Sequence, residues 1–235
     1  MDTNTSQTFS FTTNDLAEIK NPWPNDQSIG IGLNPTLNIT VFDKEGDNLT
    51  IDWYSNSNGT WELFGSNNYV VNGTYNQTNT NFSEHNTKYY WYVNVSDEMT
   101  TNTSSIFEFT TNNKPTISEP GPTNQSTDID KRPQLNITVN DIEGDALTIN
   151  WFSNSTDGAT WEEFGTNISV ENGTYHQTNL NFSTHNTTYY WYVTANDGKD
   201  TTMSDIYHFN TGPNKLPTIT DEYPENLQEN VSRYP

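Results

Sequence analysis

The chain repeats itself at the length of a whole domain. Residues 34–65 and 72–97 return, nearly motif for motif, about one hundred positions later. The first copy contains NPTLNITVFDKEGDNLTIDW and the second contains RPQLNITVNDIEGDALTINW. This period is too long for small helical or leucine-rich repeats and matches one small globular domain. The sequence therefore predicts a tandem array of domains.

Both ends of the chain continue the same pattern. SQTFSFTTN, which ends at Asn14, matches SSIFEFTTN, which ends at Asn112, and SDIYHFNTG, which ends at Gly212. We therefore expect a piece of a longer tandem protein. Its expected parts are the last strand of a preceding repeat (1–13), repeat 1 (14–113), repeat 2 (114–213) and the first strand region of a following repeat (214–235).

Composition removes several classes of partner. The chain has 9 Lys and Arg against 30 Asp and Glu, a formal net charge of -21. Such a surface repels nucleic acid and anionic membranes. No apolar run approaches the roughly 20 residues that span a bilayer. We therefore expect no nucleic-acid partner and no membrane span in this segment. The absence of cysteine excludes a disulfide framework.

Strand signals dominate both copies. Apolar residues alternate with polar ones from Leu135 to Val139 and again from Leu147 to Trp151, which predicts a hairpin around the DIEGDA turn. Asn172-Gly173, repeated as Asn72-Gly73, predicts a second, two-residue hairpin. The pattern gives about seven short strands per repeat, which is typical of an antiparallel sandwich.

Two segments resemble known families. TTYYWYVTANDGKDTTMSDIYHFNT resembles the last two strands of fibronectin type III domains, with Tyr189 in the place of the tyrosine corner. The D-x-E-G-D turn is similar to that of immunoglobulin-like and cadherin-like repeats in bacterial and archaeal surface proteins. The resemblance implies an all-β fold of tandem immunoglobulin-like (fibronectin type III-like) antiparallel β-sandwiches. It also implies a prokaryotic, archaeal, cell-surface origin and an extracellular location.

Acidic turns make calcium the one cofactor that the sequence suggests. Three carboxylates within five residues suit a hard cation, and the turn after the sixth strand should lie at the same end of the sandwich. The candidate ligands are Asp43, Glu45, Asp47 and Asp97 in repeat 1, and Asp141, Glu143, Asp145 and Asp197 in repeat 2. The alternative is ordinary turn chemistry, in which Asp caps backbone amides and Gly accepts a positive φ.

N-glycosylation signals are frequent. The chain has about 17 N-x-[ST] sequons, against roughly 8 expected from composition alone. The candidate acceptors are Asn72, Asn81, Asn172 and Asn181. An outward strand face built from Asn and Thr also generates N-x-T through its two-residue period, so the excess has a structural explanation as well.

Aromatic residues are predicted on the outer face of the sandwich. If Tyr189, Trp191 and Val193 point inward, their neighbours point outward. The outward set, which could stack on glycans, is Tyr54, Tyr90, Tyr92, Phe152, Tyr190 and Tyr192. Cross-strand aromatic pairs also stabilise a sheet with no ligand, by roughly 0.2 to 1 kcal/mol each.

The sequence lacks the common catalytic motifs. It has no cysteine nucleophile, no G-x-S-x-G, no H-E-x-x-H and no phosphate-binding glycine loop. It predicts a non-enzymatic extracellular segment, a stalk, spacer or adhesive layer. Its expected partners are neighbouring repeats of the same chain, with surface glycans or other surface proteins as further candidates. The alternatives are a carbohydrate-binding or adhesin array and the accessory repeats of a larger secreted enzyme.

Overall fold

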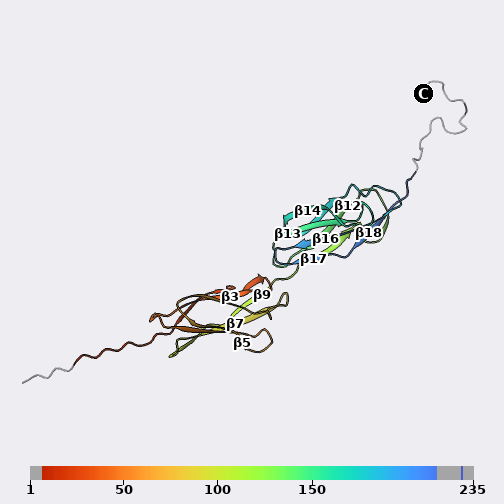
Figure 1. The fold of residues 1–235 in the computed structure, drawn as a ribbon. Helices are drawn as coiled ribbons and strands as arrows, with labels where there is room; N and C mark the ends of the chain where they lie inside the picture. The colour runs from red at the N-terminus through yellow and green to blue at the C-terminus, as the bar shows by residue number, and fades with distance from the viewer. Residues whose placement is uncertain (1–6, 216–228, 230–235) are drawn as a thin grey trace, which may run out of the picture.

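Two β-sandwiches follow one another along the chain, lying end to end (Figure 1). The structure is a computed structural model that describes residues 7–215 and residue 229. All regular elements in this part of the chain are strands, and no helix there is long and apolar enough to cross a membrane. The all-β fold predicted from the sequence is therefore confirmed.

Repeat 1 contains nine strands in two sheets. The strands are β1 (Glu18–Trp23), β2 (Ser28–Ile31), β3 (Thr36–Phe42), β4 (Leu49–Ser55), β5 (Glu62–Val70), β6 (Gly73–Thr78), β7 (Lys88–Ser96), β8 (Thr101–Thr103) and β9 (Phe107–Thr111). One sheet has the order β1-β3-β6 and the other β2-β9-β7-β4-β5, with β8 paired to β7.

Repeat 2 has the same topology. Its strands are β10 (Thr116–Gly121), β11 (Ser126–Ile129), β12 (Gln134–Asn140), β13 (Leu147–Ser153), β14 (Glu162–Val170), β15 (Gly173–Thr178), β16 (Thr188–Asn196), β17 (Thr201–Met203) and β18 (Tyr207–Thr211). The sheets are β10-β12-β15 and β11-β18-β16-β13-β14, with β17 paired to β16.

Each repeat has nine strands, two more than the pattern predicted. One addition arises because the first strand of each repeat leaves one sheet and joins the other. After β1, which pairs with β3, the chain forms β2, which runs parallel to the last strand, β9. The other addition is the three-residue strand β8. The sandwich is antiparallel apart from the two parallel pairs β2–β9 and β11–β18.

The two predicted hairpins are wrong. β12 and β13, on either side of the DIEGDA turn, belong to different sheets, and so do β14 and β15 on either side of Asn172-Gly173. The Asn172 side chain explains the second case. Its carbonyl accepts from the Asp141 amide at 2.7 Å and its amide donates to the Asp141 carbonyl at 2.8 Å, which ties the start of β15 to the end of β12.

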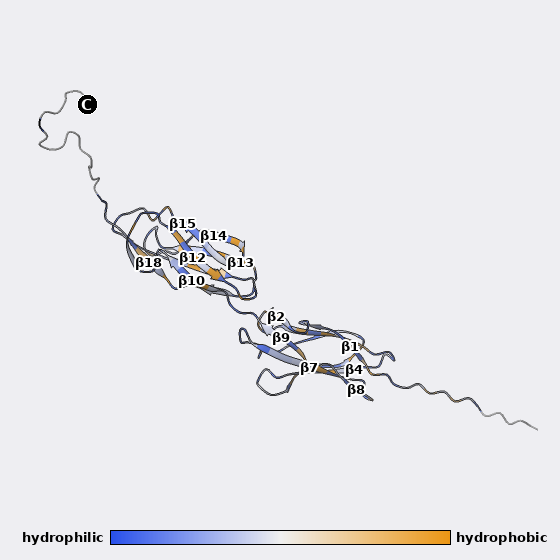
Figure 2. Ribbon diagram, turned by 180° about the vertical axis from the view of Figure 1, so that it is seen from behind, coloured by the Kyte–Doolittle hydropathy of each residue, from blue (hydrophilic) through white to orange (hydrophobic). Residues whose placement is uncertain are grey.

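The core of each repeat is a stacked tryptophan pair surrounded by aliphatic and aromatic side chains. Trp53 lies 5.8 Å from Trp91, and Trp151 lies 5.8 Å from Trp191, between ring centroids. All four are fully buried. Apolar residues concentrate on the strands (Figure 2). The inward positions predicted from alternation are confirmed for β16, where Tyr189, Trp191, Val193 and Ala195 are buried.

The predicted tyrosine corner is present in both repeats. The hydroxyl of Tyr189 accepts a hydrogen bond from the Thr184 amide at 2.9 Å, and that of Tyr89 accepts from the Glu84 amide at 3.1 Å. A tyrosine that bonds the backbone a few residues upstream is a hallmark of immunoglobulin-like sandwiches. This contact fixes the loop before β7 and the loop before β16, and the loop before β7 carries His85, which belongs to the junction described next.

Candidate functional site at the junction of the repeats

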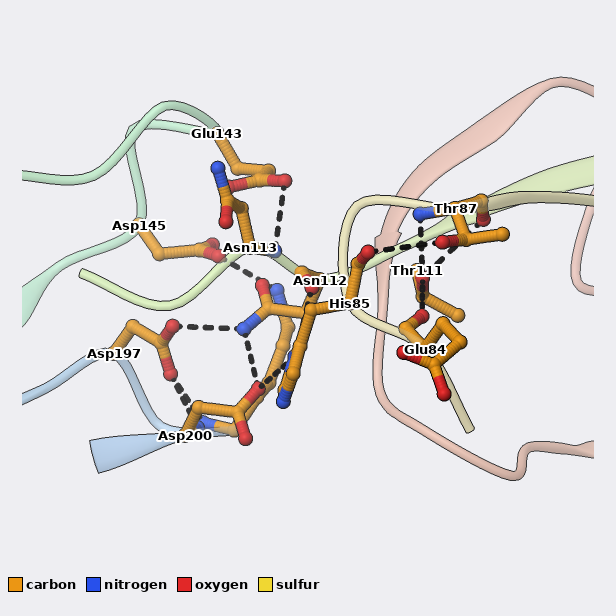
Figure 3. A network of polar contacts seen from close by, with 11 residues as sticks. Glu84, His85, Thr87, Thr111, Asn112, Asn113, Glu143, Asp145, Asp197 and Asp200 are labelled. Atoms are coloured by element: carbon orange, nitrogen blue, oxygen red, sulfur yellow. Dashed lines mark hydrogen bonds and ion pairs between the residues drawn. The ribbon is translucent and has the colours of Figure 1, made fainter. Parts of the chain in front are cut away.

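A short linker carries Asn112 from the end of β9 into repeat 2 (Figure 3). Asn112 is fully buried. Its side-chain amide donates to Asp197 Oδ2 at 2.8 Å and to Asp200 Oδ2 at 2.9 Å, both in the loop between β16 and β17. The next residue, Asn113, donates its backbone amide to Glu143 Oε1 at 3.1 Å. The linker is thus bound to both acidic loops at the near end of repeat 2.

A histidine of repeat 1 joins the same network. His85 Nδ1 lies 3.4 Å from Asp200 Oδ2 and 3.1 Å from the Asn112 carbonyl oxygen. The loop that carries His85 is held by buried Thr111, whose hydroxyl donates to the Glu84 carbonyl and accepts from the Thr87 amide (Figure 3). Both sides of the junction therefore contribute positioned polar groups.

Lys199 supplies a positive charge to this acidic end of repeat 2. Its Nζ lies 2.7 Å from Asp145 Oδ2, so the turn between β12 and β13 and the turn between β16 and β17 meet. On the other side, Gly30 of β2 approaches closely. A methyl group at Gly30 would lie 3.2 Å from Glu143 Cγ and 3.3 Å from Lys199 Nζ. A side chain at Gly30 would therefore crowd Glu143 and Lys199, which would have to move by a few tenths of an ångström.

An equivalent contact is present at the near end of repeat 1, and we call this hydrogen bond from a linker Asn to an Asp of the following loop the clamp. Asn14 Nδ2 donates to Asp97 Oδ2 at 2.7 Å and to Thr100 Oγ1 at 3.2 Å. The Asp15 amide donates to Glu45 Oε2 at 3.3 Å. Asn14 and Asn112 occupy equivalent positions after an F-x-F-T-T segment. The same contact is therefore made twice: an Asn that precedes the first strand of a repeat is bound by an Asp of that repeat.

These hydrogen bonds keep the clamp carboxylates ionised. Asn14, together with the Thr100 amide and hydroxyl, holds the pKa of Asp97 well below its ordinary value. Burial pushes the pKa of Asp197 upward, but hydrogen bonds from Asn112 and from the Asp200 and Lys199 amides outweigh it, so this pKa is also lowered. The hydrogen-bonded carboxylate, with its negative charge, is the form that the junction stabilises.

Some carboxylate oxygens of the acidic turns accept hydrogen bonds from backbone amides of the same turn. Asp43 Oδ1 accepts from the Gly46 and Asp47 amides, and Asp141 Oδ1 accepts from the Asp145 amide. Asp97 and Asp197 cap two amides each in the same way. This is the turn chemistry weighed as the alternative to calcium. The structure adds a role for Glu45 and Glu143, which accept from the linker.

Among the described residues, other carboxylate oxygens of these turns accept no hydrogen bond and could bind a cation. Asp43 Oδ2, Asp141 Oδ2 and Glu143 Oε2 are buried and have no hydrogen-bond partner in the described part of the chain. Over the same residues, no group of three or more His, Cys, Asp or Glu side chains is arranged to hold a metal ion. At repeat 2 the Lys199 ammonium already neutralises Asp145. Calcium binding stays a prediction for both repeats.

The four candidate glycosylation sites fall into two kinds. Asn72 and Asn172 each use both amide atoms to bond the backbone of Asp43 or Asp141. Asn81 and Asn181 are exposed on the loop before the tyrosine corner. The described hydrogen bonds of the Asn181 side chain amount to one long contact of 3.3 Å to Thr156 Oγ1. Asn81 and Asn181 are therefore the better placed acceptors.

The outward aromatic residues form pairs on the sheet face. Tyr54 stacks on Tyr92 at 4.9 Å, and Phe152 stacks on Tyr192 at 4.8 Å, between ring centroids. Trp61 and Trp161 pack against Tyr92 and Tyr192 in T-shaped arrangements. The stacked faces of these rings contact one another, which is the cross-strand stabilisation given above as the alternative to glycan stacking. Tyr190 differs because it is 40% exposed, and Tyr90 is half-buried.

Sequence reasoning missed the linker residues of the junction. Asn14 and Asn112 lie at the predicted domain boundary, and neither was among the predicted site residues. The available signal was their equivalent placement after the same F-T-T segment. Their partners lie 83 to 88 residues away in the chain, so no local pattern pairs them.

Comparisons with known proteins give matches among solved structures alone. No family model matches the chain, and no curated protein matches it. Among solved structures, the FN1–FN3 domains of chicken CNTN1 are 16% identical with a TM-score of 0.35, over 81% of this chain and 64% of that one. This chain thus spans less than two thirds of the CNTN1 chain.

Two further solved structures are similar. A marsupial T cell receptor is 9% identical with a TM-score of 0.45, over 86% of this chain and 75% of that one. A chimeric titin Z1Z2 tandem is 12% identical with a TM-score of 0.30, over 81% and 98%. The sandwich assignment for this chain rests on its own strand pairing.

Proposed function

We propose that this chain is a non-enzymatic structural or adhesive segment on the outside of a cell, in which tandem sandwiches act as a stalk or spacer. The observation that carries the proposal is the repeated junction. Asn14 and Asn112 enter the following repeat in the same way and meet equivalent aspartates. A contact repeated at successive boundaries propagates one orientation along an array.

The linker leaves little freedom between the two sandwiches. β9 ends at Thr111 and β10 begins at Thr116. Two of the four residues between them, Asn112 and Asn113, are hydrogen bonded to repeat 2. A third, Pro115, restricts the backbone. Inter-domain motion is the default where interfaces are small and polar, and here a buried amide bound to two carboxylates opposes it.

The surface composition supports an exposed, soluble array. A net charge of -21 keeps neighbouring molecules apart. Numerous sequons and exposed asparagines at Asn81 and Asn181 suit the outside of a cell that glycosylates its surface proteins. The alternative of accessory repeats in a larger secreted enzyme places the same segment outside the cell, and the full-length gene distinguishes the two.

Two measurements test the proposal. Residual dipolar couplings of the full chain should give one common alignment tensor for repeats 1 and 2, as for a single stiff rod. An antibody against residues 14–213 should label intact cells of the source organism. Independent tensors would contradict the spacer role, and labelling only after lysis would contradict the surface location.

A further inference from the structure

A hollow lies at one end of repeat 2, beside the exposed ring of Tyr190. It measures about 570 Å³ and is lined by the loop of residues 154–158, by the segment of residues 181–188 and by β16. Binding sites for small ligands are commonly clefts of about 300–1,000 Å³ with a few placed polar groups. The hollow has the dimensions of such a site.

The loop that walls this hollow is longer in repeat 2. Ten positions separate Trp151 from Trp161, against eight between Trp53 and Trp61. In repeat 1, Asn56 Oδ1 accepts from the Tyr90 amide at 3.2 Å and holds the loop against β7. The equivalent Asn154 instead donates to the Gly158 carbonyl at 3.1 Å, within its own loop.

The longer loop is shaped by its own hydrogen bonds. Asp157 Oδ1 accepts from the Ala159 and Thr160 amides, and its Oδ2 accepts from the Thr160 hydroxyl at 2.6 Å. These bonds, the Thr160 hydroxyl first, lower the pKa of Asp157 to about 2. The carboxylate is thus ionised at neutral pH, with both oxygens engaged. The wall of the hollow is organised by the protein itself, which lowers the ordering cost of binding.

Tyr190 provides an aromatic platform at the edge of the hollow. Its ring is 40% exposed and rests against His208 at 5.3 Å between centroids. The rest of the lining is rich in hydroxyl and amide groups, from Ser155, Thr156, Asn181, Ser183, Thr184 and Thr188. Asp157 is the one ionised residue among the lining side chains, and its oxygens are already hydrogen bonded.

We propose that this hollow binds a neutral saccharide. One C–H face of a sugar ring would pack on Tyr190, because an aromatic ring offers a rigid apolar surface. The sugar hydroxyls would exchange hydrogen bonds with the Ser, Thr and Asn side chains. An anionic ligand is disfavoured by Asp157 and by the net charge of -21.

The saccharide could come from two sources, a free glycan or a glycan attached to this chain. Asn181, the acceptor of an N-F-S sequon, lines the hollow together with Ser183. A glycan attached at Asn181 would have its first sugars beside Tyr190. Both sources present the same chemistry to the same residues, and chains produced with and without glycosylation separate them.

The test uses the unglycosylated full chain with 13C-labelled tyrosine rings. Maltotriose, cellotriose, mannotriose and chitotriose are titrated to about 10 mM, which detects a Kd near 1 mM. At least one should shift the Tyr190 ring signals saturably. Tyr190→Ala should weaken that binding at least tenfold in calorimetry, and the matched Tyr90→Ala in repeat 1 should leave it unchanged. Replacing the 154–160 loop by the shorter repeat 1 loop should abolish it.

Glycosylation of Asn181 identifies the source. If the attached glycan occupies the hollow, the glycosylated chain should show the Tyr190 shifts without added sugar and should not bind the trisaccharides. If it does not, both forms should bind them. The proposal is overturned if no trisaccharide and no attached glycan shifts the Tyr190 ring, or if Tyr190→Ala binds as tightly as the parent chain. Either result leaves the spacer proposal standing.

Discussion

The two repeats share one core and differ at their ends. Their tryptophan pairs stack at the same distance, with interplanar angles of 16° and 17°. At the far end of repeat 1, Gly30 lies close to Glu143 and Lys199, and Asn112 donates to Asp197. At the equivalent end of repeat 2 the chain has Asp128 and Gly212. The tryptophan core is therefore the same in both repeats, and the contacts at their ends are what distinguishes one repeat from the other.

The two clamps differ in charge. Asn14 binds Asp97 and the neutral Thr100, whereas Asn112 binds Asp197 and a second carboxylate, Asp200. Beside the second clamp, the positive charge of Lys199 helps to lower the pKa of Asp197, and His85 Nδ1 lies 3.4 Å from Asp200 Oδ2. The comparison indicates that the amide-to-aspartate contact is the constant part of the junction, and that the surrounding charges are adjusted around it.

The largest expected effect tests whether the two cores are independent. Trp191→Ala should lower the stability of repeat 2 by about 3–5 kcal/mol, because it removes a fully buried ring from a small core. Tyr190→Ala should cost about 1 kcal/mol or less. Calorimetry of the full chain should show one transition displaced and the repeat 1 transition unchanged. Equal displacement of both transitions would mean that the sandwiches unfold as one unit.

Calcium should distinguish the two acidic ends. A cation bound only by the folded state stabilises it by about 2.7 kcal/mol at a hundredfold excess over its Kd. Repeat 1 should respond more, because Met99 stands where repeat 2 has Lys199, whose ammonium competes for Asp145. The measurement is calorimetry in millimolar calcium and then in chelator.

A substitution at Lys199 sharpens the calcium comparison. Lys199→Met should raise the calcium response of repeat 2 toward that of repeat 1, because it removes the competing ammonium. Small-angle scattering of the same samples should show whether calcium also changes the maximum dimension. If calcium leaves the melting temperature unchanged in the parent chain and in this variant, the D-x-E-G-D segments are ordinary turns that bind no calcium.

Removing the junction amide should loosen the two repeats without unfolding either one. Asn112→Ala leaves the buried Asp197 without its side-chain donor, which should cost about 1–3 kcal/mol. The alignment tensors of the repeats should then separate. Asn14→Ala is the matched control, since it removes the same amide at the other clamp. If Asn14→Ala separates the alignment tensors and Asn112→Ala does not, the Asn112 contact is not what restrains the two repeats.

Adding one methyl group at the close approach should have a smaller effect. Gly30→Ala introduces strain at a φ of 66° and a Cβ that contacts Glu143 and Lys199. Gly59→Ala is the control, because it has a φ of 86° and no neighbour within 4 Å. Both should lose about 1 kcal/mol from backbone strain. Only Gly30→Ala should change the alignment between repeats.

Acid should weaken the clamps in a defined order. A carboxyl with a lowered folded pKa contributes stability above its unfolded value, 3.8 for Asp197, and loses it as the pH falls through the folded value. The pKa of Asp97 is lowered further, so the Asp197 clamp should be lost at a higher pH. NMR titration of the two carboxyl signals between pH 7 and about pH 2 measures the order, and a reversed order would contradict this account.

Local pattern was enough to predict the fold class and the facing of the strands. The alternation through Tyr189, Trp191 and Val193 places these side chains inside because successive strand residues point to opposite faces. The same rule placed Tyr190 and Tyr192 outside. Tyr189 was also identified as the corner tyrosine, and its hydroxyl makes the expected backbone contact.

Tertiary structure alone decided which strands pair and what the ends of the repeats do. Leu147 could not be assigned to a sheet from its neighbours, because both a hairpin and a crossing between sheets satisfy the same alternation. Asn112 reads locally as a linker residue, and only folding brings it to Asp197. The hollow at Tyr190 likewise forms only where the loop of residues 154–158 meets the segment of residues 181–188 and β16, which lie further along the chain. The alternation of apolar and polar residues shows which side chains are buried. Strand pairing and the junction between repeats are contacts between residues far apart in the chain, which this alternation does not specify.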